Sequence, residues 1–271
     1  RRVGRRWMDL AGAGGLAAGL AIAISWLRPP LPSVHDEFSY LLAADTFSHG
    51  RLTNPTHPMW EHFETPHEIQ QPTYASKYPP GQGLILALGQ VTAGHPVVGL
   101  WISVALAAAA TTWMSRAWMP RRWALLGGLL VALHTGIQLI WTQTYWGGNV
   151  AFIGGALVLG AYARLRRAPR CRDAVWLALG LAILANSRPF EGAVASLPVA
   201  LAMLRWLIGL AAEAPAADSN LERQRGGWGT TRWRFGLVSR PPNTDRTFPP
   251  SPPRRVVLTL ALVLAAAATW M

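Results

Sequence analysis

The sequence predicts an all-α protein, a polytopic transmembrane helical bundle of about seven spans with one long loop after the first span. Half of the residues (51%) are hydrophobic and only 14% are charged, which is too few charges for a soluble domain of 271 residues. The apolar residues form blocks of roughly 15 to 22, the length that crosses a hydrocarbon core about 30 Å thick. Leu, Ala, Val and Gly occupy every face of these blocks, which excludes amphipathic surface helices.

Arginine runs at the ends of the apolar blocks predict the topology. The net charge is +12, but charge placed beside apolar blocks is typical of topology signals, so we expect no nucleic-acid partner. Arg1, Arg2, Arg5 and Arg6 precede the first block, which places the N-terminus in the cytoplasm and the next loop outside. We therefore expect a multi-pass protein of the cell inner (plasma) membrane, surrounded by membrane lipids. The single Cys171 excludes an internal disulfide.

The spans can be assigned so that every arginine run lies on one side. Residues 81–92 are apolar but too short to cross a bilayer, so we interpret them as a re-entrant or surface-lying helix. The only basic residues left on the outer side are Arg28, Arg51, Lys77 and Arg188. The predicted spans are 7–27, 96–118, 123–141, 150–163, 174–186 and 193–210, with a last one from 256.

The chain divides into a transmembrane region and a tail. Residues 1–210 form the transmembrane region, with the outer loop 28–80 inside it. Residues 211–254 are rich in Pro, Gly, Ser and Arg, which predicts a flexible cytoplasmic linker. Residues 255–271 begin a further transmembrane helix that is still apolar at the last residue, so we expect an N-terminal fragment of a longer protein.

The outer loop 28–80 concentrates the groups that can carry chemistry. It holds six of the thirteen carboxylates, five of the seven histidines and the only lysine. Asp36, Glu37 and Tyr40 come just after the first span, and Ser33 with Asp36 fits a capping box that begins a short juxtamembrane helix. The two carboxylates either cap this helix, or serve as a general base or as ligands of a divalent cation.

Two cations on the outer side are candidates for binding phosphate. Lys77-Tyr78 precedes a Pro-Pro pair at the loop's end, and the alternative is a simple turn into the helix at 81–92. Arg188 lies at the mouth of a span, where it either extends its charge to the membrane surface or binds phosphate in a bidentate manner.

Histidines and aromatic residues give weaker signals. His57, His62 and His67 recur every five residues among glutamates, and such side chains can bind zinc. This spacing does not align them on one helical face, so we favour a polar loop over a metal site. The second outer turn is bordered by Trp141, Tyr145 and Trp146, which are interface aromatics or faces for a sugar ring.

These features together resemble the polytopic glycosyltransferases of the GT-C type, family 39, which includes protein mannosyltransferases and aminoarabinose transferases. The resemblance covers about residues 1–210 and depends on the pattern D-E-x-x-Y at residues 36–40, a K-x-P-P element at residues 77–80 and the short helix that follows. The chain departs from the family in lacking a second acidic residue in its next outer loop, 142–149, and in its long linker.

The resemblance implies transfer of a sugar from a polyprenyl-phosphate-linked donor to a lipid or protein acceptor at the outer face. Asp36 would be the catalytic base or would position a metal, with Glu37 in support. Lys77 would lie near the donor phosphate. We add Arg188 from its charge and position, and Tyr40 and Tyr78 as substrate-binding residues beside the motifs.

Two other functions remain open. A transporter or flippase of a lipid-linked or anionic substrate would bury ionisable groups within its spans, whereas the predicted spans contain almost none, with His134 and Arg205 as exceptions. The third possibility is a non-catalytic membrane fragment.

Overall fold

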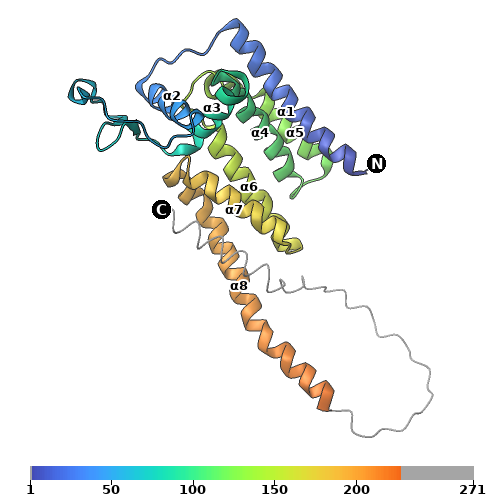
Figure 1. Cartoon of the computed structure of the whole chain (residues 1–271). Coiled ribbons are helices and arrows are strands. Elements are labelled where there is room, and N and C mark those ends of the chain that lie inside the picture. Colours follow the sequence, from blue (N-terminus) through green and yellow to red (C-terminus); the bar gives the residue numbers. More distant parts are fainter. Residues whose placement is uncertain (1, 227–271) are drawn as a thin grey trace.

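The computed structural model describes residues 2–226, and this part of the chain is mostly helical (Figure 1). Helices α1, α4 and α5 pack together, α4 also contacts α6, and α6 packs against α7. Helices α2 and α3 form a pair beside this bundle together with the loop that joins them. The elements are α1 (Arg2–Leu27), α2 (His35–Ser48), the 3-10 turn η1 (Trp60–Phe63), β1 (Glu68–Ile69), β2 (Ala75–Ser76), α3 (Pro80–Ala93), α4 (Val97–Ser115), α5 (Arg121–Leu133), the π-helical turn η2 (Ile137–Trp141), α6 (Asn149–Arg167), α7 (Cys171–Ala185) and α8 (Pro189–Gly226).

Three helices of the described part are long and apolar enough to cross a membrane, over Trp7–Leu27, Val97–Ser115 and Pro189–Gly209. The helical class and a membrane association are therefore supported, but the seven-span count is not confirmed. Helix α7 has only 15 residues, and α6 carries three arginines in its last turn, which lower its mean hydropathy.

The predicted span 123–141 is wrong as a continuous helix. Helix α5 ends at Leu133, His134 is extended (ψ 115°), and a separate π-helical turn begins at Ile137. The side chain of Gln138 bridges the break, because its Nε2 donates to the Ala132 carbonyl at 2.7 Å and to the Ala17 carbonyl at 3.2 Å. The buried amide thus pairs the Ala132 carbonyl, which lost its helical partner where α5 ends, and ties the break to α1 through Ala17.

Small residues let the bundle helices approach closely. Ala13, Ala17 and Ala21 are fully buried at four-residue intervals and form the face of α1 that packs with α4 and α5. Where α6 crosses α7, a Cβ on Gly180 would lie 2.8 Å from the Gly154 carbonyl oxygen. In a membrane this close packing, not the hydrophobic effect, is the main attraction between helices.

Helix α3 agrees with the predicted short helix at 81–92. Its 14 residues span about 21 Å, less than the hydrocarbon thickness. Leu84, Leu88 and Val91 lie on one face and are 44–66% exposed, as expected for a helix whose apolar face contacts lipid.

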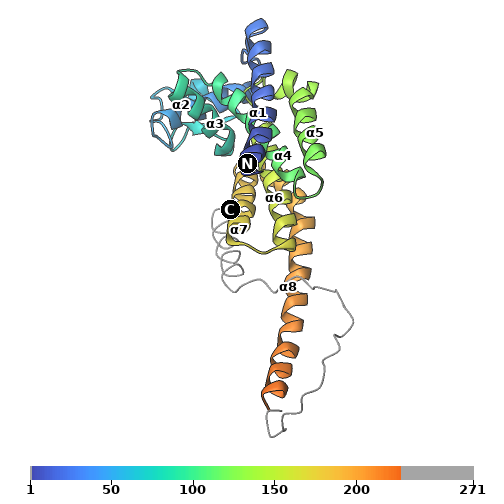
Figure 2. The ribbon, with the colours of Figure 1, turned by 90° about the vertical axis from the view of Figure 1, so that its right-hand side faces the viewer.

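The linker prediction for 211–254 is wrong over its first part, because α8 continues to Gly226 (Figures 1 and 2). Ala supplies five of residues 211–226, and Glu and Arg supply two each; all three are strong helix formers. The remainder of the linker, 227–254, and the further transmembrane helix predicted at 255–271 lie outside the described residues.

Candidate functional site

A buried carboxylate joins two loop segments at the start of α2. Glu37 is fully buried. Its Oε2 accepts hydrogen bonds from the Ser33 and Val34 backbone N–H groups, at 2.8 and 3.2 Å, and from the Ser33 hydroxyl at 3.3 Å. Its Oε1 accepts from the Tyr145 N–H at 2.8 Å. Glu37 thereby fixes the turn before α2 to the loop between η2 and α6.

This arrangement corrects the predicted helix start. The sequence pattern paired Ser33 with Asp36, but the side chain that reaches back to the first turn is that of Glu37. The helix accordingly begins at His35, one residue later than a Ser33 cap implies. The consequence is that Asp36 is released from capping and is available for other contacts.

Asp36 forms a compact cluster with Tyr78 and His67. The Tyr78 hydroxyl donates to Asp36 Oδ1 at 2.6 Å. His67 Nδ1 lies 2.6 Å from the Tyr78 oxygen and 3.0 Å from Asp36 Oδ1. The hydroxyl proton of Tyr78 is directed to Asp36, so it is not available to His67. Nδ1 of His67 therefore carries a proton, which it directs toward the Tyr78 oxygen and Asp36 Oδ1. In the neutral imidazole, Nε2 is then the basic nitrogen.

Both potential proton acceptors are reachable from solvent. The Asp36 and His67 side chains are 31% and 30% exposed. Burial raises the pKa of Tyr78 well above its usual range, and the Asp36 carboxylate raises it further. Tyr78 therefore stays a hydrogen-bond donor at every physiological pH.

A buried serine holds the cluster on α2. Ser39 Oγ donates to the His67 carbonyl at 2.7 Å and lies 2.8 Å from Ser76 Oγ. Ser76 Oγ in turn accepts from the Tyr78 N–H at 3.2 Å. The antiparallel pairing of β1 with β2 sets Glu68 opposite Ser76, and the Lys77 N–H donates to the His67 carbonyl at 3.2 Å, so the hairpin brings the chain at His67 close to the chain at Tyr78.

Aromatic rings surround the cluster. Tyr40 stacks on Tyr78, with ring centroids 4.7 Å apart and an interplanar angle of 20°, and His35 stacks on His67 at 5.9 Å. Burial raises the pKa of Tyr40, while the positive charge of Arg188 opposes the rise. Arg188 thus lies within electrostatic reach of the cluster.

The two predicted cations have different positions. Arg188 donates to the Gly147 carbonyl at 3.4 Å and to Glu191 at 3.2 Å, and the Gly81 N–H nearby donates to the Asn186 carbonyl at 2.6 Å. The segment after α7 is thereby fixed beside the start of α3. Lys77 is exposed, and its Nζ donates to the Pro66 carbonyl at 3.1 Å. The structure places Lys77 on the hairpin but shows no contact with Asp36 or Tyr40.

The predicted metal ligands do not fit a shared cation. Asp36 and Glu37 are adjacent in sequence, but both Glu37 oxygens are engaged by backbone N–H groups. His57 contacts the ring of Phe63 at 5.0 Å and accepts from Met59, away from His67. Among residues 7–209, whose side chains the structure describes, no group of three His, Cys, Asp or Glu side chains is placed to hold a metal ion.

His67 is the residue that sequence reasoning undervalued. It was one of three evenly spaced histidines, and nothing in the spacing distinguished it from His57 or His62. Its distinguishing neighbour is Tyr78, 11 residues later, and only the pairing of β1 with β2 reveals that proximity.

Comparison of the chain with protein-family models, with curated proteins and with solved structures found no match in any of the three.

Proposed function

We propose that this chain is a membrane glycosyltransferase that moves a sugar from a polyprenyl-phosphate-linked donor to a lipid or protein acceptor at the membrane face that carries loop 28–80. The single observation that carries the proposal is the Asp36–His67–Tyr78 cluster, with Arg188 close by, at the ends of apolar helices. The D-E-x-x-Y and K-x-P-P patterns support the same function, because they supply Asp36, Tyr40 and Tyr78.

The proposed reaction is a displacement at the anomeric carbon of the donor. The acceptor oxygen forms a bond to that carbon, the bond from the carbon to the phosphate oxygen breaks, and the phosphate leaves with the electron pair. The acceptor's proton passes either to Asp36 or to Nε2 of His67. Asp36 and Tyr78 hold the His67 ring in place. Arg188 stabilises the charge on the departing phosphate.

The other predicted residues take supporting roles. Tyr40 and Tyr78 present stacked rings on which a sugar face can pack. Glu37 positions Asp36 and does not touch substrate, since it is fully buried. Lys77 would meet a phosphate only at the edge of the site, so Arg188 is the principal phosphate ligand. No step of the mechanism passes through a metal ion.

The test is sugar transfer by membranes that contain the chain, supplied with radiolabelled polyprenyl-phosphate sugars. We expect Asp36→Asn to lower the rate by roughly 100-fold or more, the usual contribution of a positioned base. Asp45→Asn is the matched control, because Asp45 lies on the same helix but is half-exposed and outside the cluster. Transfer by Asp36→Asn at the control rate would overturn the proposal.

A second variant distinguishes whether Asp36 or His67 accepts the proton. His67→Gln preserves a side chain that can bond to Asp36 and Tyr78 but cannot accept the proton. If His67 is the base, this variant loses transfer as Asp36→Asn does. If Asp36 accepts the proton directly, His67→Gln retains most of the activity.

A further inference from the structure

Arg188, the cation assigned to the donor phosphate, carries a counter-ion on the same guanidinium. Glu191 lies in the first turn of α8, three residues after Arg188. Arg188 Nη1 donates to Glu191 Oε1 at 3.2 Å, and Nη2 donates to the Gly147 carbonyl at 3.4 Å. The two side chains of the ion pair are 43% and 65% exposed. A phosphate that reaches Arg188 therefore also meets the carboxylate of Glu191.

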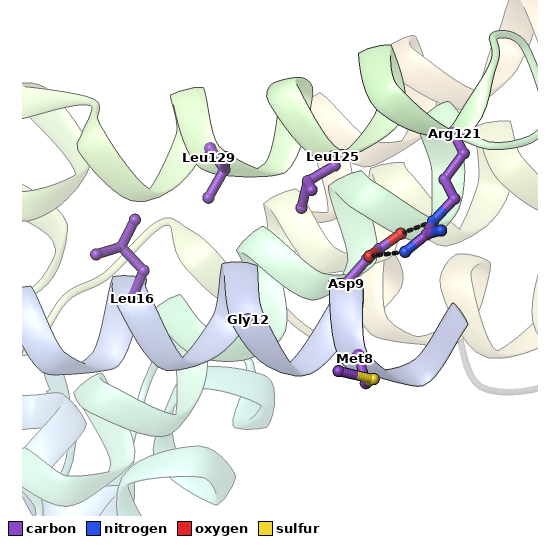
Figure 3. Close-up of a pocket in the computed structure, with 7 residues that line it drawn as sticks. All are labelled: Met8, Asp9, Gly12, Leu16, Arg121, Leu125 and Leu129. Carbon is purple, nitrogen blue, oxygen red and sulfur yellow. Dashed lines mark hydrogen bonds and ion pairs between the residues drawn. The ribbon is translucent and has the colours of Figure 1, made fainter. Parts of the chain in front are cut away.

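This ion pair differs from the one that joins α1 to α5. There Asp9 and Arg121 face each other at one end of an apolar hollow (Figure 3). Asp9 accepts from Nε and Nη2 of Arg121 at 2.6 and 2.7 Å, and its side chain is only 7% exposed. It is a further ionisable residue inside the first predicted span. The pair of Arg188 and Glu191 instead has one longer contact in solvent, and exposed pairs of this kind contribute little to stability. Another anion can therefore take the place of Glu191 on Arg188.

Glu191 also lies within electrostatic reach of the Asp36 cluster. Burial raises the pKa of Tyr40, the positive charge of Arg188 opposes the rise, and the negative charges of Asp36 and Glu191 add to it. Tyr40 stacks on Tyr78, which donates to Asp36. A phosphate held by Arg188 beside Tyr40 therefore experiences the negative charge of Glu191.

The proposed transfer changes the charge of the phosphate. The donor is a phosphodiester with one negative charge. When the bond from the anomeric carbon to the phosphate oxygen breaks, the electron pair stays on that oxygen, and the acceptor's proton passes to Asp36 or His67. The product is a phosphomonoester, whose charge at pH 7 is between about −1.5 and −2. An arginine without a counter-ion would hold this product more tightly than the donor and would slow its release.

We propose that Glu191 offsets the charge of Arg188, so that the site releases the polyprenyl-phosphate product after transfer. This inference rests on the proposed function. With both residues charged, the pair is neutral overall and gives the monoester little advantage over the diester. With Glu191 neutralised, the positive charge of Arg188 attracts the additional charge of the monoester. One unit of charge at contact distance in water corresponds to about fivefold in affinity, so an advantage of roughly threefold to fivefold is expected.

The experiment measures binding of two lipids that lack a sugar. The purified full chain in detergent is titrated with undecaprenyl phosphate, a monoester, and with its methyl ester, a diester with the same lipid tail. Glu191→Gln preserves the length of the side chain, and glutamine is also favoured in the first turn of a helix. We expect this variant to raise the ratio of monoester affinity to diester affinity about threefold or more over that of the parent chain.

Two control variants and a change of salt separate this effect from a structural one. Glu191→Asp preserves the charge, and Glu64→Gln removes the charge of an exposed glutamate of loop 28–80; both should keep the affinity ratio of the parent chain. The increase in Glu191→Gln should disappear at 1 M salt, where the Debye length is only about 3 Å. A change of fold would persist in salt.

An unchanged affinity ratio in Glu191→Gln would overturn this proposal and leave the proposed transfer standing, since that depends on Asp36. An equal increase in Glu64→Gln would also overturn it. If the parent chain binds neither lipid, both this proposal and the phosphate role of Arg188 in the proposed function are wrong. A last measurement needs no variant: because the pair is neutral overall, the ratio in the parent chain should change less than about twofold between about 0.05 and 1 M salt. A steep fall of that ratio would show that Glu191 does not offset Arg188.

Discussion

Removal of the Glu37 carboxylate should release loop 28–80 from the bundle. In Glu37→Ala, the N–H groups of Ser33, Val34 and Tyr145 lose their acceptor. Ser33 and Val34 are exposed, so water can replace the carboxylate there, and the cost is close to that of a lost helix cap, about 1 kcal/mol. The hydrogen bond to Tyr145 is buried, and an unsatisfied buried donor costs about 1–3 kcal/mol.

The expected loss is therefore about 3 kcal/mol, before any relaxation of the space left by the side chain. Because each 1.4 kcal/mol is about tenfold in an equilibrium constant, the population of chains with an open loop should rise roughly a hundredfold. The loop offers its own probe, since trypsin cleaves after Arg51 and Lys77, both of which lie within it.

The assay is the rate of tryptic cleavage after Lys77 in the folded, detergent-solubilised chain. When opening and closing are fast relative to cleavage, this rate follows the open population. Glu64→Ala is the matched control, because Glu64 is an exposed glutamate of the same loop, and it should change the rate less than twofold. Cleavage of Glu37→Ala within fivefold of the control would refute the role assigned to Glu37.

Two further predictions concern the crossing of α6 with α7 and a tyrosine of loop 28–80. Gly180→Val should destabilise the chain by about 1–3 kcal/mol, because the added Cβ meets the Gly154 carbonyl oxygen at 2.8 Å; an unchanged midpoint of thermal unfolding would contradict this. Burial and the neighbouring Glu68 raise the pKa of Tyr74 to about 12, so the difference in phenolate absorbance between the parent chain and Tyr74→Phe should have its midpoint near pH 12. The pKa of Tyr74 in the folded chain exceeds the unfolded value of about 10. The stability contributed by neutral Tyr74 is therefore complete below about pH 10 and is lost as the pH rises toward 12. An absorbance midpoint near pH 10 would contradict the assignment.

The sequence was most informative where composition alone decides the structure. Apolar blocks predicted helices, and the short block at 81–92 was predicted as a separate helix because it is too short to span and follows a Pro-Pro pair. In the structure Gly94, with a positive φ, ends this helix. The break at His134 was not predictable from hydropathy, since Gln138 compensates for it through contacts with Ala17 on another helix. Helical residues after 210 were hidden by their polar composition.

For the candidate site, the sequence identified the ends of the loop but not the contacts between them. Asp36 and Tyr78 were both singled out, and their hydrogen bond joins residues 42 positions apart. His67 was undervalued because its partners come from β-hairpin pairing and from Ser39 on α2. Such contacts depend on the register of a two-residue strand pair, which no local pattern specifies.

The adjacent carboxylates of the D-E-x-x-Y pattern acquire separate roles from helix geometry. Consecutive residues of an α-helix point about 100° apart, so Glu37 is directed into the bundle, toward Tyr145, when Asp36 is directed toward the hairpin. Tyr40, one turn after Asp36, falls on the Asp36 side and stacks on Tyr78. In this chain the buried acid fixes the helix, and the accessible acid that precedes it contacts the loop. It follows that the shorter side chain in Glu37→Asp would withdraw the carboxylate from the Tyr145 N–H and shift Asp36 with it.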